Sequence, residues 1–225
     1  MSCRIDHIAV VADSLEAGSE FVFQCLGVRP RQGGKHPRMG THNRLLRLGD
    51  GLFLEVIAID PAAPAPARPR WFGFDTLPVG AAPRLAFWVA RVDDDIHQAL
   101  ADAPEALGVA EPMTRGELQW LISIPENGSL PLDGVAPALI HWHAASHPAL
   151  AMEDQGCRLV ALELLHPEPE RVDRLLASLA VAEPGVGLSV TRSGVAGLVA
   201  TLRTPQGLRT IGGPAGAAGA FAVDA

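Results

Sequence analysis

The stretch Ile5-Asp6-His7-Ile8-Ala9-Val10-Val11 decides the fold, because it is an apolar run with a histidine at its centre. Its Ile and Val content predicts a buried β-strand over residues 4–12. A second run, Leu52-Phe53-Leu54-Glu55-Val56-Ile57-Ala58-Ile59, has a glutamate at its centre. An unpaired polar side chain inside a buried strand is costly. We therefore expect His7 and Glu55 either to satisfy each other or to hold a shared partner such as a divalent metal.

The residues between these two runs predict one helix and one further strand. Apolar residues recur at helical spacing over 15–26, Ser14 can cap the start of this helix, and Gly27 can end it. Strands are expected over 43–48 and 52–59, joined by a Gly-Asp-Gly turn that is typical of a hairpin. This order, a strand and a helix followed by two or three strands, is that of a βαβββ module.

The same order recurs at a period of about 75–80 residues, which indicates repeated supersecondary units. The second copy has predicted strands over 84–92, 118–124 and 137–144 with a helix to about Ala103, and the third has strands over 158–165, 186–192 and 195–203 with a helix over 168–179. We expect an α+β fold of tandem βαβββ modules whose curved mixed sheets surround a cleft, plus a shorter third βαββ unit. The expected divisions are 1–60 and 84–150 for the two modules, 61–83 for the packed connection, 151–211 for the partial third unit and 212–225 for a flexible tail.

Composition excludes several classes of protein. The chain has 225 residues, a net charge of −7 and 48% hydrophobic residues. It has no Lys/Arg block, so we expect no nucleic-acid partner. We also expect neither a membrane span nor a signal peptide, and the three widely spaced cysteines suit a reducing cytoplasm. Signatures of serine hydrolases and nucleotide-binding loops are missing.

Strand alternation selects candidate metal ligands. Residues two apart share a face, so His7 should share its face with Ile5 and Ala9, and His141 should share its face with His143. A concave face holding His7, Glu55 and His141 would suit Fe, Mn, Zn or Ni with positions left open for substrate. The alternative is structural: a buried histidine bonded to Glu55 or a carbonyl, and a carboxylate paired with an arginine.

Two polar segments are candidates for substrate binding. The stretch 33–43 contains His36, Thr41 and Asn43 and is either a substrate-binding loop at the cleft mouth or a solvated turn. Arg115 and Trp120 lie in a segment that either aims an arginine at an anion or forms a surface hairpin. Trp142 would add an aromatic wall. His36 or His143 could act as a general acid or base.

The sequence resembles the glyoxalase-like branch of the vicinal oxygen chelate superfamily. The similar stretches are Gly34-Lys35-His36-Pro37-Arg38-Met39-Gly40-Thr41-His42-Asn43, Arg68-Pro69-Arg70-Trp71-Phe72-Gly73, Asp133-Gly134-Val135-Ala136-Pro137 before Ile140-His141-Trp142, His147-Pro148 and Leu165-His166-Pro167-Glu168-Pro169. The resemblance implies metal ligands on the first and last strands of each module. His7 and Glu55 match these positions in the first module and His141 falls near one in the second, but Phe87 falls near the other and cannot ligate.

Two functions follow from this resemblance. The first is a divalent-metal-dependent lyase, isomerase or dioxygenase acting on a small oxygenated substrate. The second is a binding protein that sequesters a small molecule in the same cleft without turnover, which the Phe87 position and the aromatic residues favour. A homodimer is compatible with either function.

Overall fold

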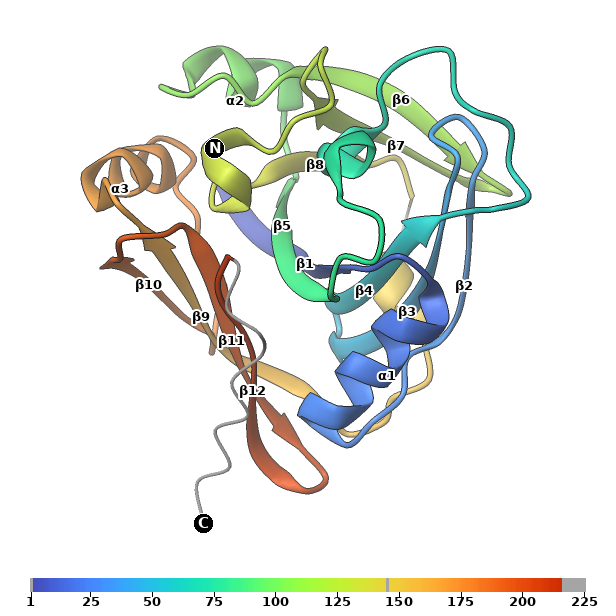
Figure 1. The fold of residues 1–225 in the computed structure, drawn as a ribbon. Coiled ribbons are helices and arrows are strands. Elements are labelled where there is room, and N and C mark those ends of the chain that lie inside the picture. Colours follow the sequence, from blue (N-terminus) through green and yellow to red (C-terminus); the bar gives the residue numbers. More distant parts are fainter. Residues whose placement is uncertain (1, 145, 216–225) are drawn as a thin grey trace.

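The computed structural model describes residues 2–144 and 146–215. Its centre is an eight-stranded sheet in the order β2-β3-β4-β1-β5-β8-β7-β6, curled into a half-barrel (Figure 1). The two modules join where β1 (Cys3–Val11) runs antiparallel to β5 (Arg84–Val92). Within each module the first strand pairs in parallel with the last. The expected α+β fold of tandem modules is confirmed.

The modules have matching element orders. The first continues from β1 with α1 (Leu15–Leu26), β2 (Arg31–His36), β3 (Thr41–Gly49) and β4 (Leu52–Ile59). The second continues from β5 with α2 (Ile96–Asp102), β6 (Val109–Arg115), β7 (Leu118–Ile124) and β8 (Ala138–Trp142). Short 3-10 helices lie in the connections: η1 (Trp71–Thr76), η2 (Pro131–Gly134) and η3 (Pro148–Ala151). Helix α1 starts where the Ala17 N–H donates to Ser14 Oγ and ends at Gly27, whose φ of 71° is left-handed.

Strands β2 and β6 were not predicted, and they form the two edges of the sheet. Both are polar and contain Gly or Pro, which is typical of edge strands because one side of such a strand faces no partner. The edges come together through ion pairs from Arg38 and Arg68 to Glu111. Within the stretch 33–43, which was a candidate loop, residues 33–36 and 41–43 therefore lie in strands.

The third unit contains β9 (Arg158–His166), α3 (Pro169–Ser178), β10 (Gly187–Arg192), β11 (Gly197–Thr204) and β12 (Gly207–Pro214). It has one strand more than expected, and its order β10-β9-β11-β12 differs from that of the modules. Strand β12 also occupies the start of the stretch expected to be a tail, and residues 216–225 lie outside the described part of the chain.

The half-barrel separates two apolar cores. The outer core lies between its convex face, α1, α2 and the four-stranded sheet. The inner core on the concave face includes Trp71, Phe72, Trp120 and Ile140 and borders the pocket described below. In the described residues, no helix is both long and apolar enough to cross a membrane.

Candidate functional site

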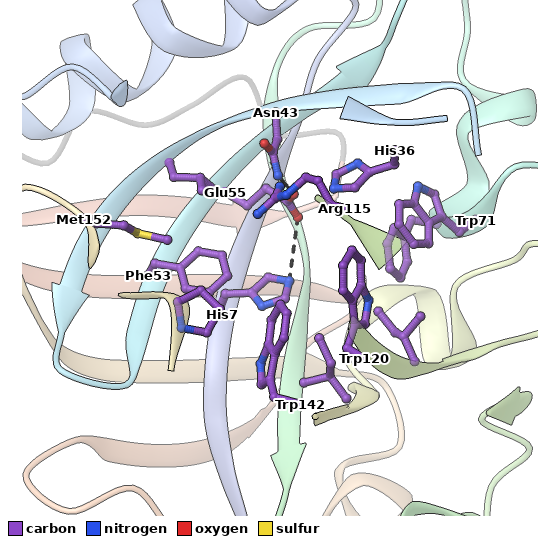
Figure 2. A pocket seen from close by; sticks show the side chains of 15 residues that line it. His7, His36, Asn43, Phe53, Glu55, Trp71, Arg115, Trp120, Trp142 and Met152 are labelled. Carbon is purple, nitrogen blue, oxygen red and sulfur yellow. Dashed lines mark hydrogen bonds and ion pairs between the residues drawn. The ribbon is translucent and has the colours of Figure 1, made fainter. Parts of the chain in front are cut away.

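The concave face holds a narrow pocket of about 40 Å³. Its polar residues come from the first module and from the end of β6, and its walls are aromatic and apolar (Figure 2). The lining residues are His7, His36, Asn43, Leu45, Phe53, Glu55, Trp71, Phe72, Arg115, Trp120, Ile122, Ile140, Trp142, Pro148 and Met152. The structure thus brings together most of the predicted site residues.

A β-bulge between Ile5 and His7 interrupts the alternation of β1. The expectation that Ile5 shares the face of His7 is wrong, because Ile5 packs in the outer core while His7 lines the pocket. The bulge also brings the fully buried Asp6 beside His7, with Asp6 Oδ1 2.7 Å from His7 Nδ1. Sequence reasoning did not select Asp6, although a charged residue in an apolar strand was a signal.

Asp6 accepts hydrogen bonds from three side chains. Trp142 Nε1–H donates to Asp6 Oδ2 at 2.9 Å, and His147 Nε2 lies 2.9 Å from the same oxygen. Because the Ala149 N–H donates to His147 Nδ1, we assign the His147 proton to Nε2. Burial by itself would raise the pKa of Asp6, but the hydrogen bonds from His147 and His7 outweigh it and hold that pKa well below its usual range. Ionised Asp6 therefore keeps a proton on His7 Nδ1 and leaves Nε2 facing the pocket.

His7 Nε2 faces the carboxylate of Glu55, with 3.6 Å between Nε2 and Oε2 (Figure 2). The other oxygen of Glu55 accepts a hydrogen bond from Asn43 Nδ2 at 2.5 Å. Without a proton on Nε2, His7 Nε2 and Glu55 Oε2 would be two acceptors that face each other inside a buried site. This arrangement is stable only when a proton or a cation lies between the two atoms.

His36 lines the pocket, whereas Thr41 lies behind it and does not. Trp71 Nε1–H donates to Thr41 Oγ1 at 3.3 Å, and Thr41 Oγ1 lies 3.1 Å from His36 Nδ1. Burial lowers the pKa of His36 to about 4, and the charge of Glu55 only partly opposes this. The expectation of a near-neutral pKa for His36 is therefore wrong, since burial keeps its ring uncharged at pH 7. The Thr41 hydroxyl is hydrogen-bonded to His36 and Trp71, so direct substrate contact by Thr41 is likewise not supported.

The structure separates His141 from His7 and Glu55. Pocket-lining Ile140 and Trp142 occupy the concave face of β8, so alternation sends His141 to the other face. There His141 Nδ1 donates to the Val92 carbonyl at 2.8 Å, and His141 borders a different, larger cavity. The exposed His143 lies beside His141, with 5.3 Å between ring centroids. Neither histidine lines the pocket, so the predicted ligand set of His7, Glu55 and His141 is not assembled.

Apart from Arg115 at the end of β6, the second module faces the pocket with apolar and aromatic residues. Val89, not Phe87, is the partner of His7 across the β1–β5 ladder, and Phe87 pairs with Ala9. Phe87 is buried and stacks on Phe72 with 4.0 Å between ring centroids. Phe72 has a φ of 56°, a strained value for an aromatic residue that this packing helps to maintain.

We tested whether the residues present fit a divalent metal. Two ligands about 2.1 Å from one ion at a tetrahedral angle are roughly 3.4 Å apart, close to the separation of His7 Nε2 and Glu55 Oε2. Asp6 is hydrogen-bonded to His7 and Asn43 is hydrogen-bonded to Glu55. Such hydrogen bonds commonly orient the side chains that bind a metal. No group of three His, Cys, Asp or Glu ligands occurs in the residues described. The pair therefore fits a divalent ion as two of its ligands, with the others left to ligand or water oxygens.

The fold and the site define a class of protein: an α+β protein with a pocket on the concave face of a half-barrel sheet. A model of the glyoxalase-like domain matches residues 5–180. The chain belongs to this family, within the vicinal oxygen chelate superfamily. No curated protein matches the chain significantly.

Solved structures share the fold at low sequence identity. A hypothetical protein from Staphylococcus aureus is 12% identical with a TM-score of 0.58, and the match covers 87% of this chain and 88% of that one. A methylmalonyl-CoA epimerase from Mycobacterium tuberculosis is 14% identical with a TM-score of 0.41, covering 65% of this chain and 90% of that one. At 12% identity, the likeness to the Staphylococcus aureus protein shows the fold alone.

Proposed function

We propose that this protein is an enzyme that transfers a proton on a small oxygenated molecule bound in the pocket, with His7 and Glu55 as the acid–base pair. The observation that carries this proposal is the 3.6 Å approach of two buried acceptors, His7 Nε2 and Glu55 Oε2. A pair that needs one proton between them can take it from a substrate and return it. Asp6 and Asn43 would hold the two groups in position during the transfer.

A divalent ion, Fe, Mn, Zn or Ni, is the cofactor that this proposal includes. Members of the superfamily commonly use divalent metals, and His7 Nε2 and Glu55 Oε2 would hold the ion here. With the ion bound, Glu55 through its other oxygen, Oε1, would be the group that takes and returns the proton. When bound, it would act as a Lewis acid toward a substrate oxygen. Whether the reaction is that of a lyase, an isomerase or a dioxygenase depends on the substrate, and proton transfer favours the first two.

The test combines metal analysis with hydrogen exchange. Protein purified without a chelating tag is analysed for metals, and deuterium uptake from D2O into small hydroxy- and oxo-carbonyl compounds is followed by NMR. We expect a bound or bindable divalent ion and exchange that His7→Gln and Glu55→Gln each reduce by about 100-fold or more. If wild type exchanges hydrogen no faster than His7→Gln, and if His7→Gln binds metal as well as wild type does, the proposal is contradicted.

The second candidate is a protein that sequesters a small molecule without turnover. It is favoured by the aromatic and apolar wall that the second module contributes, where Trp120, Ile140 and Trp142 line the pocket. Under this function a ligand should raise the thermal midpoint equally with and without a chelator. A strict metal requirement for binding would count against it.

A further inference from the structure

Arg115 is a cation without a partner in the pocket. It ends β6, and its guanidinium extends over the pocket toward Glu55 and Asn43 (Figure 2). Within the residues described, it forms neither a hydrogen bond nor an ion pair. Arg38 and Arg68, close to the same strand, both bind Glu111. The free charge of Arg115 therefore faces the ligand space.

A glycine makes room for this arginine. A Cβ added to Gly34 would lie 2.6 Å from Arg115 Cδ, closer than real Cβ atoms approach other atoms, and a tight 3.1 Å from its Nε, so the end of the Arg115 side chain would have to shift. The Gly34 N–H also donates to Asn43 Oδ1 at 2.7 Å, which turns the amide nitrogen of Asn43 toward Glu55. Because Gly34 has no side chain, Arg115 can cross the edge strand β2 at this position. The Gly34 N–H also orients Asn43, the hydrogen-bond partner of Glu55.

We infer that Arg115, admitted by Gly34, binds the carboxylate of a short-chain ligand. This inference rests on the proposed function, in which the pocket binds a small oxygenated molecule. A planar guanidinium matches a carboxylate through two parallel hydrogen bonds. An oxygen on the adjacent carbon would then reach toward His7 and Glu55, as in a 2-hydroxy or 2-oxo acid.

The size of the pocket limits the rest of the ligand. Its volume of about 40 Å³ is far below the ~150 Å³ of a cavity that takes benzene. Phe53, Trp120 and Trp142 form its apolar walls. The narrow space favours a short-chain ligand over a bulky one.

Tryptophan fluorescence provides the test, because Trp71, Trp120 and Trp142 line the pocket. Lactate and pyruvate are titrated as probes, with lactamide as the neutral isostere of lactate. We expect millimolar or tighter binding of at least one acid and at least about tenfold weaker binding of lactamide. Arg115→Met should weaken acid binding about tenfold or more and leave lactamide unchanged, with partial recovery in Arg115→Lys.

Gly34→Ala tests the role of the glycine through a separate variant. It should displace Arg115 and weaken lactate binding to the level of Arg115→Met. Gly49→Ala is the matched control on β3, since its Cβ would meet only Leu52 Cβ at an ordinary 3.7 Å. Acid binding that is absent at millimolar concentration, or equal in wild type and Arg115→Met, overturns the inference. Lactate binding that survives in Glu55→Gln while hydrogen exchange is lost there would separate this anion subsite from the acid–base pair.

Discussion

The two halves of one curled sheet face the same pocket with opposite chemistry. The first module supplies His7, His36, Asn43 and Glu55, whereas β7 and β8 of the second module supply Trp120, Ile122, Ile140 and Trp142. The backbones of the two modules repeat each other strand for strand. The difference shows that a duplicated fold can keep its shape while its two copies face one pocket with different side chains, titratable ones from the first module and, apart from Arg115, apolar and aromatic ones from the second.

The halves nevertheless depend on each other through Asp6. Its carboxylate, in the first module, accepts hydrogen bonds from Trp142 of the second module and from His147 beyond it. The aromatic wall is thus anchored to the polar half. Breaking this link should have the largest effect on the molecule.

Asp6→Ala should lower the free energy of unfolding by roughly 3–5 kcal/mol, because it leaves three buried donors without their acceptor. Urea unfolding of the variant and wild type at pH 7 measures this difference. Glu153→Gln is the control, since both side chains of the pair of Glu153 with Arg31 are about 60% exposed and the pair should matter little. A loss below about 1 kcal/mol in Asp6→Ala would mean that the two halves are not coupled in this way.

The burial of His36 should appear as a pH dependence of stability. Its folded pKa of about 4 lies below the unfolded value near 6.5, so the unfolded chain binds more protons between these two values. Stability due to this group is complete above about pH 6.5 and is lost as the pH falls toward 4. Between pH 7.5 and 4.5 wild type should lose roughly 2 kcal/mol more than His36→Gln in urea titrations. Parallel curves for the two proteins would refute the assignment.

Adding a metal-binding side chain to the second module should show whether that module can be given the chemistry of the first. Val89 stands opposite His7 on the neighbouring strand, at a cross-strand distance of about 5 Å between Cβ atoms. Val89→His should therefore raise the affinity for Zn(II) or Co(II) at least about tenfold, or about 1.4 kcal/mol. The visible spectrum of bound Co(II) reports the change. The gain should vanish in the double variant with His7→Gln, and a gain that persists there would place the new site elsewhere.

Several elements could be predicted because their causes are local. The strands containing His7 and Glu55 are apolar runs, and α1 has its cap at Ser14 and its left-handed glycine at Gly27. The strands β2 and β6 could not, because edge strands need no apolar face and their polar sequences are typical of loops. Pattern alone also missed the bulge before His7, which depends on pairing with β5.

The sequence by itself determined the repeated order of strand and helix in the two modules, apart from the edge strands β2 and β6, and that His7 and Glu55 would lie buried near each other, since periodicity and burial follow from residue type. Alternation correctly placed His141 and Ile140 on opposite faces of β8, but only the curvature of the sheet decided which face encloses the pocket. The tertiary structure also decided the partners of Asp6 and the passage of Arg115 over Gly34. Such contacts join residues far apart in the chain, and no local propensity encodes them.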